Sequence, residues 1–267
     1  YKPLIFNNMK KLVTIVVMAF FMTIAFGQDD KPLFLLFEFM HVDEGQMANY
    51  EKTEEFWEKV HVQRVKNGDC IGWDLWRLEP SGQKQGAQFM TVSLYNDPVK
   101  MMEGGDFLKA WNAAYPNLTE SANNEKMAMT AKSRDLTHRV FLRQIDLTND
   151  DFDMPIGTLA VINFMKAKPG QAAAYEKMES EVFKPMHQKE VESGGRASWG
   201  MLRNMLGYAT EAYATHIVFD MYTGYDQFFN GGNNTPLTEA QQKAMQDIAN
   251  IRDLKSISMA TLVRKVR

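Results

Sequence analysis

The sequence of 267 residues predicts an α+β protein in which two copies of one unit pack sheet to sheet. The second half repeats the first, because residues 45–52 (GQMANYEK) return as residues 170–177 (GQAAAYEK). Three pairs of ring-bearing residues recur in the same way, namely His61 with His187, Trp73 with Trp199 and Tyr95 with Tyr222. Each copy also carries strand and helix patterns in the order β-α-β-β-α-β. Since a repeated unit must bury its apolar face, the sister copy is the expected partner.

Each copy begins with a short apolar run and a longer amphipathic segment. Residues 33–40 and 158–165 are rich in β-compatible residues and are the predicted first strands. Residues 46–66 and 171–192 are the predicted first helices. On the first of these helices, one stripe at helical spacing contains Tyr50, Trp57, His61 and Arg64.

The remainder of each copy consists of two strands, a helical region and a closing strand. Alternation of apolar and polar residues predicts the middle strands at 71–78, 88–95, 197–204 and 215–222. Thr119 and Thr238 are plausible N-caps for the helical regions that follow. The closing strands are predicted at residues 137–145 and 258–266, with Arg134 and Arg252 at the ends of the preceding helical regions.

The first 27 residues are set apart from this repeat. Lys10 and Lys11 precede an apolar run that ends in Gly27, a pattern that predicts a secretory signal cleaved before Gln28. We therefore expect an exported protein, periplasmic or secreted. A membrane anchor is the alternative, but the run is shorter than the roughly 20 apolar residues that cross a bilayer. No stable membrane span is expected after cleavage.

The expected organisation is a leader at residues 1–27, a first repeat at 28–146, a linker at 147–157 and a second repeat at 158–267. The linker is acidic and irregular. A calcium loop would need oxygen ligands at alternating positions with a glycine and a closing acid, and that pattern is incomplete here. A solvated linker is the favoured interpretation.

Composition excludes several classes of function. The chain has 30 Lys and Arg against 33 Asp and Glu, a formal net charge of −3, and the signs are mixed. Nucleic acid is therefore not an expected partner, because no basic patch is present. The single cysteine, Cys70, excludes an intramolecular disulfide. No nucleophile elbow, phosphate loop, dinucleotide fingerprint or zinc-protease motif occurs.

The element order resembles the ferredoxin-like split unit, an antiparallel sheet with both helices on one face. Two such units in one chain resemble the tandem-fused members of the dimeric α+β barrel superfamily, over residues 31–267. The resemblance implies a closed or nearly closed barrel with the helices outside. It does not imply one function, because the superfamily includes haem-degrading and polyketide-oxidising monooxygenases, chlorite-decomposing haem enzymes and stress proteins with no settled activity.

His61 and His187 are the candidate catalytic residues, since each occupies the same place on the first helix of its copy. Histidine is the side chain that acts most readily as base or metal ligand near neutral pH. The competing interpretation is a half-buried histidine that packs on the sheet and bonds a nearby carbonyl. In the second copy one extra residue precedes His187, and Pro185 lies close by, which predicts a kink or a one-residue bulge in that helix.

The other candidate site residues are polar or aromatic and occupy matched positions. Glu38 and Asn163 interrupt the apolar first strands, where a buried polar group must find a partner or a ligand. A tryptophan on a strand is more often a core filler than a ligand plate, and the tyrosines equally suit a packing role. The expected ligand-binding residues between sheet and helices are Glu38, Tyr50, Trp57 and Trp73 in the first copy, with Asn163, Tyr175, Phe183 and Trp199 in the second.

The resemblance also suggests haem as a cofactor. In the haem-degrading monooxygenases of the superfamily, an Asn of the first strand, a Trp and a His line the pocket, and Asn163 and Trp199 are comparable with the first two. The His of those enzymes lies on the second helix, whereas His187 lies on the first, so their catalytic roles are not carried over. No metal ligand set is expected.

The sequence therefore predicts an exported protein that binds or processes a small hydrophobic or aromatic molecule. The alternatives are a haem-binding or monooxygenase-type enzyme and a noncatalytic stress or structural module. Arg134 and Arg252 suggest an anion site, although a surface pair with the following aspartate or a helix-end charge is favoured. Further homo-oligomerisation stays open.

Overall fold

The computed structural model describes residues 32–79, 82, 84, 86–207, 212–232 and 236–267. The predicted leader and its cleavage site lie outside the described residues, so export stays a prediction. In the described part of the chain, no helix is both long enough and apolar enough to span a bilayer.

The two halves of the chain place their elements in the same order. In the first half these are β1 (Phe34–Val42), α2 (Met47–Lys66), β2 (Gly72–Glu79), β3 (Phe89–Tyr95), α3 (Pro98–Glu103), α4 (Phe107–Ala114), α5 (Glu120–Ser133) and β4 (Arg134–Leu147). In the second half they are β5 (Leu159–Ala167), α6 (Ala172–Met178), the π-helix η1 (Glu179–Phe183), α7 (Lys184–Glu192), β6 (Ser198–Asn204), β7 (His216–Tyr222), α8 (Tyr225–Asn230), α9 (Glu239–Ile251) and β8 (Arg252–Val266). The predicted N-caps are confirmed, because Thr119 and Thr238 accept hydrogen bonds from the first turns of α5 and α9.

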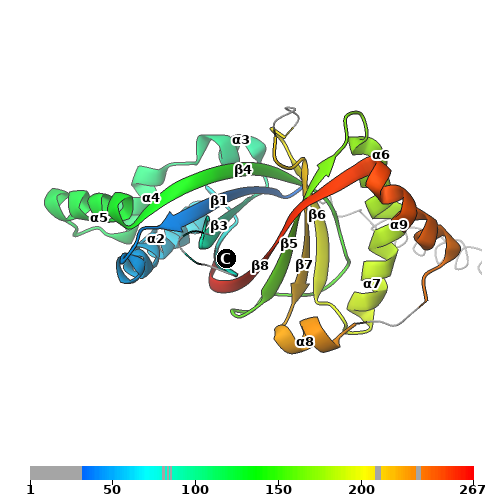
Figure 1. Cartoon of the computed structure of the whole chain (residues 1–267). Helices are drawn as coiled ribbons and strands as arrows, with labels where there is room; N and C mark the ends of the chain where they lie inside the picture. Colours follow the sequence, from blue (N-terminus) through cyan, green and yellow to red (C-terminus); the bar gives the residue numbers. More distant parts are fainter. Residues whose placement is uncertain (1–31, 80–81, 83, 85, 208–211, 233–235) are drawn as a thin grey trace, which may run out of the picture. The chain divides into compact units, whose positions relative to one another are not determined.

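The strands form one closed antiparallel barrel in the order β1-β3-β2-β8-β5-β7-β6-β4. Each half contributes four adjacent strands, and the halves meet along two hydrogen-bonded seams, β2 with β8 and β4 with β6. In Figure 1, α2, α4 and α5 gather beside the strands of the first half, and α6, α7 and α9 lie along the strands of the second. Closure leaves neither half with a free sheet edge.

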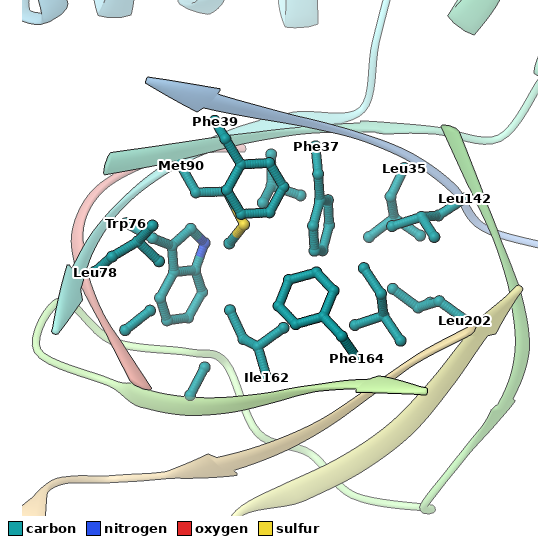
Figure 2. Packing of buried hydrophobic residues seen from close by; sticks show 14 of the residues in the cluster. Leu35, Phe37, Phe39, Trp76, Leu78, Met90, Leu142, Ile162, Phe164 and Leu202 are labelled. Carbon is teal, nitrogen blue, oxygen red and sulfur yellow. The ribbon is translucent and has the colours of Figure 1, made fainter. Parts of the chain in front are cut away.

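Apolar side chains from alternate strand positions fill the inside of the barrel. Phe37 and Phe39 of β1 point toward Ile162 and Phe164 of β5, as Figure 2 shows, and the rings of Phe39 and Phe164 are 6.1 Å apart. Trp76 of β2 belongs to the same buried cluster. Because side chains alternate along a strand, the neighbours of these residues face outward, toward the helices.

The closing strands β4 and β8 begin earlier than the sequence predicts. Arg134 and Arg252 are their first residues and pair with Val42 and Ala167, and each is also the C-cap of the preceding helix, as expected. The favoured surface pair of Arg134 with the next aspartate is also wrong, because its guanidinium lies 3.6 Å from the buried carboxylate of Glu54. A polar strand start has no apolar alternation, so its pattern does not distinguish it from a helix end.

The expected irregularity in the second half is confirmed. Where α2 is continuous, the second half has α6, the π-helical turn Glu179–Phe183 and then α7, with Pro185 in the first turn of α7. A π-helical turn accommodates one extra residue, and it also spares the helix a proline in its interior.

The connection between the halves is partly buried rather than simply solvated. Phe152 and Met154 line a cavity of about 200 Å³ at one end of the barrel interior. Thr148 is fully buried, and its hydroxyl bonds the backbone of Trp199. The expected solvation holds for part of this segment. Asp153 is exposed and pairs with Lys265. The predicted domain boundaries are not tested by these contacts.

Candidate functional site

Helix α2 presents one face to the outer surface of the first-half sheet. Its buried residues include Tyr50, Trp57 and Arg64, which lie on one stripe along the helix. His61 lies on the same stripe. Arg264 of β8 bonds Glu58 of α2 at 2.5 Å and so ties the helix to the seam between the halves. Residues of this stripe therefore lie over a sheet face to which Glu38 and Trp73 belong.

His61 is held as a neutral ring. It stacks on Trp73 with the ring centroids 4.6 Å apart and the planes 9° from parallel. Burial and the adjacent Arg64 guanidinium lower the pKa of His61 well below its usual value. The neutral ring accepts from Arg64 Nη1 through Nδ1 at 3.1 Å. A role as a protonated acid near neutral pH is therefore disfavoured for His61.

Four of the five predicted first-half residues surround one cavity. Glu38, Trp57, His61 and Trp73 line a space of about 210 Å³ between α2 and the sheet. Tyr50 is not part of this lining, because it is buried against Phe89 with the rings 4.7 Å apart. We refer to this space as the α2 pocket; its remaining lining residues are Met40, Glu54, Arg64, Thr91, Phe107, Arg134, Leu136 and Arg139.

The α2 pocket contains charged side chains that sequence reasoning did not assign to it. Arg139 pairs with Glu38 at 2.7 Å, and Arg134 lies 3.6 Å from Glu54. Burial raises the pKa of Glu54 from 4.5 to about 7, against the opposing effects of the Arg134 charge and the Tyr50 hydroxyl. Glu54 therefore exchanges a proton near neutral pH.

Three buried polar atoms of the pocket lining have no hydrogen-bond partner among the described residues. They are Glu54 Oε1, Arg64 Nε and Arg134 Nε. Glu54 Oε1 and Arg134 Nε face each other at 3.6 Å as an ion pair, so Arg64 Nε is the atom of this set with neither a hydrogen bond nor an ion pair. A larger cavity of about 630 Å³ at the other barrel end has no such atom in its lining, which includes Phe39, His138 and Tyr213.

A repeated spacing could have identified Glu54. Tyr50 and Glu54 are one helical turn apart, and Tyr175 and Glu179 repeat that spacing in the second half. Glu179 is also buried, and burial raises its pKa. A glutamate on a helix is ordinarily solvated, however, so its type alone predicts exposure.

The second half arranges the matched residues differently. His187 stacks on Trp199 at 5.0 Å, as His61 does on Trp73. Its Nδ1 lies 3.8 Å from Glu190, and burial lowers the pKa of His187 although Glu190 opposes this. Arg196 pairs with both Glu190 and Asp220.

The remaining second-half candidates are also engaged in packing or bonding. Asn163 donates to Asp220 Oδ2 at 3.0 Å and to the Val218 carbonyl. Tyr175 is fully buried and meets His216 edge to face. Phe183 is half-buried at the end of the π-helical turn. Glu190, Arg196 and Asp220 are thus paired with one another.

The residues around the α2 pocket do not fit haem. A cavity of about 150 Å³ holds benzene, so the space of about 210 Å³ takes in one substituted ring, and most of a macrocycle of four pyrroles would lie outside it. The stacking of His61 on Trp73 and its bond with Arg64 also leave it poorly placed as an axial ligand. Among the described residues, no cluster of three or more His, Cys, Asp or Glu side chains is arranged to hold a metal ion.

No protein-family model matches the sequence, and no curated protein matches it. Solved structures do match. A candidate monooxygenase from Fusobacterium nucleatum subsp. nucleatum has a TM-score of 0.57 at 11% identity, over 88% of this chain and 94% of its own. One from Lactobacillus acidophilus has a TM-score of 0.54 at 10% identity, over 89% and 96%.

An anthrone oxidase-like protein has a TM-score of 0.50 at 12% identity, over 89% of this chain and 93% of its own. These structural neighbours belong to the dimeric α+β barrel superfamily. Identities this low carry information about architecture and not about activity. The chain is therefore an α+β protein with the fold of the dimeric α+β barrel proteins.

Proposed function

We propose that the chain binds a small molecule with a single aromatic ring in the α2 pocket. The observation that carries the proposal is the lining itself, in which Trp57, His61, Trp73 and Phe107 surround about 210 Å³ beside unbonded polar atoms. Flat rings around a small, partly open space favour a flat ligand through stacking and apolar burial. The proposal concerns binding. Glu54, with a pKa of about 7, is the pocket group best suited to exchange a proton with such a ligand.

The two halves of the barrel resemble each other in sequence and in strand register. We infer that its halves are two copies of one ferredoxin-like unit, fused in tandem. The support is the sequence repeat together with matched registers, since Phe34 pairs with Tyr95 as Leu159 pairs with Tyr222. A shift of register follows Phe39 in one half and Phe164 in the other. Export through the leader remains part of the expectation from sequence.

Filling the pocket tests the proposal. Thr91 lines the α2 pocket on β3, and Thr91→Phe places a ring inside it. We expect benzamide and related single-ring ligands, titrated by calorimetry, to bind the unsubstituted protein and to lose at least about tenfold in affinity to Thr91→Phe, since overlapping rings exclude each other.

Thr91→Val is the matched control, because it removes the hydroxyl but keeps the shape and leaves the cavity open. It should bind as the unsubstituted protein does, and thermal melts establish that both variants fold. If no single-ring compound binds the unsubstituted protein at millimolar concentration, the pocket is a packing feature and the noncatalytic structural module becomes the better description.

A further inference from the structure

We propose that the ligand of the α2 pocket is an anion, a single-ring aromatic carboxylate, and that Arg64 is the residue that binds its charge. This inference rests on the proposed function and adds the chemical class of the ligand. It is carried by one buried cation without a carboxylate partner and by the contrast between the two halves of the barrel.

Arg64 is buried, with only 4% of its surface exposed, and it lines the α2 pocket. Its Nη2 donates to the Tyr95 hydroxyl and to the Gly104 carbonyl, each at 3.0 Å, and Nη1 donates to His61. All three acceptors are neutral. Among the described residues no carboxylate forms an ion pair with Arg64.

A guanidinium cannot escape its charge by losing a proton, because its intrinsic pKa is too high. Burying it without a counter-charge therefore costs free energy that neutral hydrogen bonds only partly offset. Within the part of the chain that the structure describes, the Nε atom of Arg64 has no hydrogen-bond partner. An anion in the adjacent cavity would supply both the missing charge and the missing acceptor.

The other charged residues of the pocket pair with one another and not with Arg64. Arg139 is matched by Glu38 and Arg134 by Glu54. Arg64 is thus the surplus cation of the pocket, and protonation of Glu54 at acidic pH removes the counter-charge of Arg134 as well. A neutral ligand would leave the surplus in place, whereas a carboxylate would balance it.

At the same position the second half balances its charges within the chain. Three residues after the stacked histidine, the first half has Arg64 and the second has Glu190. Glu190 and Asp220 enclose Arg196, so every charge there has a partner within the chain. The position matching Arg196, three residues before the stacked tryptophan, is the neutral Cys70. Of these two matched positions, the one without a charge partner is therefore the one that lines the α2 pocket.

Pairs of ligands that differ only in charge test the inference. Benzoate and benzamide have the same ring and nearly the same shape, and calorimetry gives the affinity of each. We expect benzoate to bind at least about tenfold more tightly, as charge-assisted hydrogen bonds are the stronger ones. In Arg64→Met that preference should vanish through a loss of benzoate affinity, with benzamide unchanged. Arg64→Lys should keep part of it.

Arg77→Met is the control for net charge, because Arg77 pairs with Glu79 on the surface away from the pocket. It should retain the preference for benzoate. Equal binding of the two ligands by the unsubstituted protein overturns the inference and leaves the proposed function standing. A preference that persists in Arg64→Met, or that disappears in Arg77→Met, also overturns it. Binding of neither ligand overturns both, and the unsubstituted protein decides the matter if Arg64→Met does not fold.

Discussion

Glu54 is the side chain whose protonation depends most plainly on its surroundings. It is 2% exposed on α2 and faces Tyr50 of its own helix, Arg134 of β4, Glu38 of β1 and Arg264 of β8. Burial dominates over the two arginines and raises its pKa from 4.5 to about 7. The folded protein therefore holds a proton that the unfolded chain has already lost above pH 4.5.

This raised pKa makes stability depend on pH with a definite sign. A folded-state pKa above the unfolded value gives a contribution that is complete below the unfolded pKa and is lost as pH rises through the folded one. Glu54→Gln carries no titrating proton at this position. Relative to that variant, the free energy of unfolding of the unsubstituted protein should fall by about 3 kcal/mol as the pH rises from 4.5 to above 7.

Urea unfolding of both proteins from about pH 5 to about pH 8 measures the difference. The comparison isolates Glu54, because the buried Glu179 and Asp74, whose pKa values are also raised by burial, are present in both. Parallel stability profiles would contradict the expected titration and would place the Glu54 pKa near its ordinary value.

At this scale the sequence predicts which residues share a face and not how their charges are balanced. Helical spacing correctly groups Trp57, His61 and Arg64, because one period of 3.6 residues determines it. Arg64 has no carboxylate partner among the described residues because Glu38 pairs with Arg139 and Glu54 pairs with Arg134. That depends on contacts between distant parts of the chain, and no local pattern reports it.

Among the elements, the break between α6 and α7 is the clearest difference between the halves. From Tyr50 to His61 the helix is continuous, whereas from Tyr175 to His187 it contains one more residue and a π-helical turn. Each residue advances an α-helix by about 100°, so an unabsorbed insertion would turn His187 away from Trp199. The π-helical turn keeps that contact.

Removing the extra residue tests this explanation. Glu181 is exposed, and its pair with Lys177 at 3.9 Å lies on the surface and contributes little. Deleting Glu181 alone should cost about 3 kcal/mol, because the continuous helix then has Pro185 in its interior. Deletion combined with Pro185→Ala should recover stability to within about 1 kcal/mol of the unsubstituted protein.

Thermal and urea unfolding, with Trp199 fluorescence as the probe of the histidine contact, compare the two variants. The single deletion serves as the matched control for the double change. Equal stability of the two would mean that the proline is not what the π-helical turn accommodates.

Strands were predictable wherever their outward and inward positions differ in polarity. The predicted 88–95 differs by one residue from β3 (Phe89–Tyr95), and 197–204 differs by one from β6 (Ser198–Asn204). The short helices α3 and α4 depend on side-chain caps, whereas α8 begins after Gly224 without one. Asp97 and Asp106, for instance, cap α3 and α4. Such short helices carry little periodic signal.

At the level of the whole molecule, each half depends on the other for its sheet edges. A fragment of residues 158–267 would expose β6 and β8, which pair with β4 and β2 in the intact barrel. Exposed edges recruit other strands. We therefore expect this fragment to form dimers or larger species, measured by light scattering after size-exclusion chromatography.

Mixing that fragment with residues 28–157 should restore a one-to-one complex, since the two seams can then form. A folded, monomeric fragment 158–267 would contradict this expectation and would mean that the seams contribute little to stability. The barrel itself was predictable, because the repeated sequence pattern predicts two similar sets of strands that can cover each other. The burial of Phe152 and Met154 at the barrel end was not, because their acidic neighbours suggest a solvated segment.

Closure of the barrel within one polypeptide has a consequence for how its sites can diverge. In a barrel assembled from two identical chains, every substitution appears on both sides, so a charge that improves one pocket is imposed on the other. Here Arg64 and Glu190 occupy matched places with opposite charge, and each is compatible with its own surroundings. A single chain can therefore keep the residues of one side internally balanced while the residues of the other side change independently.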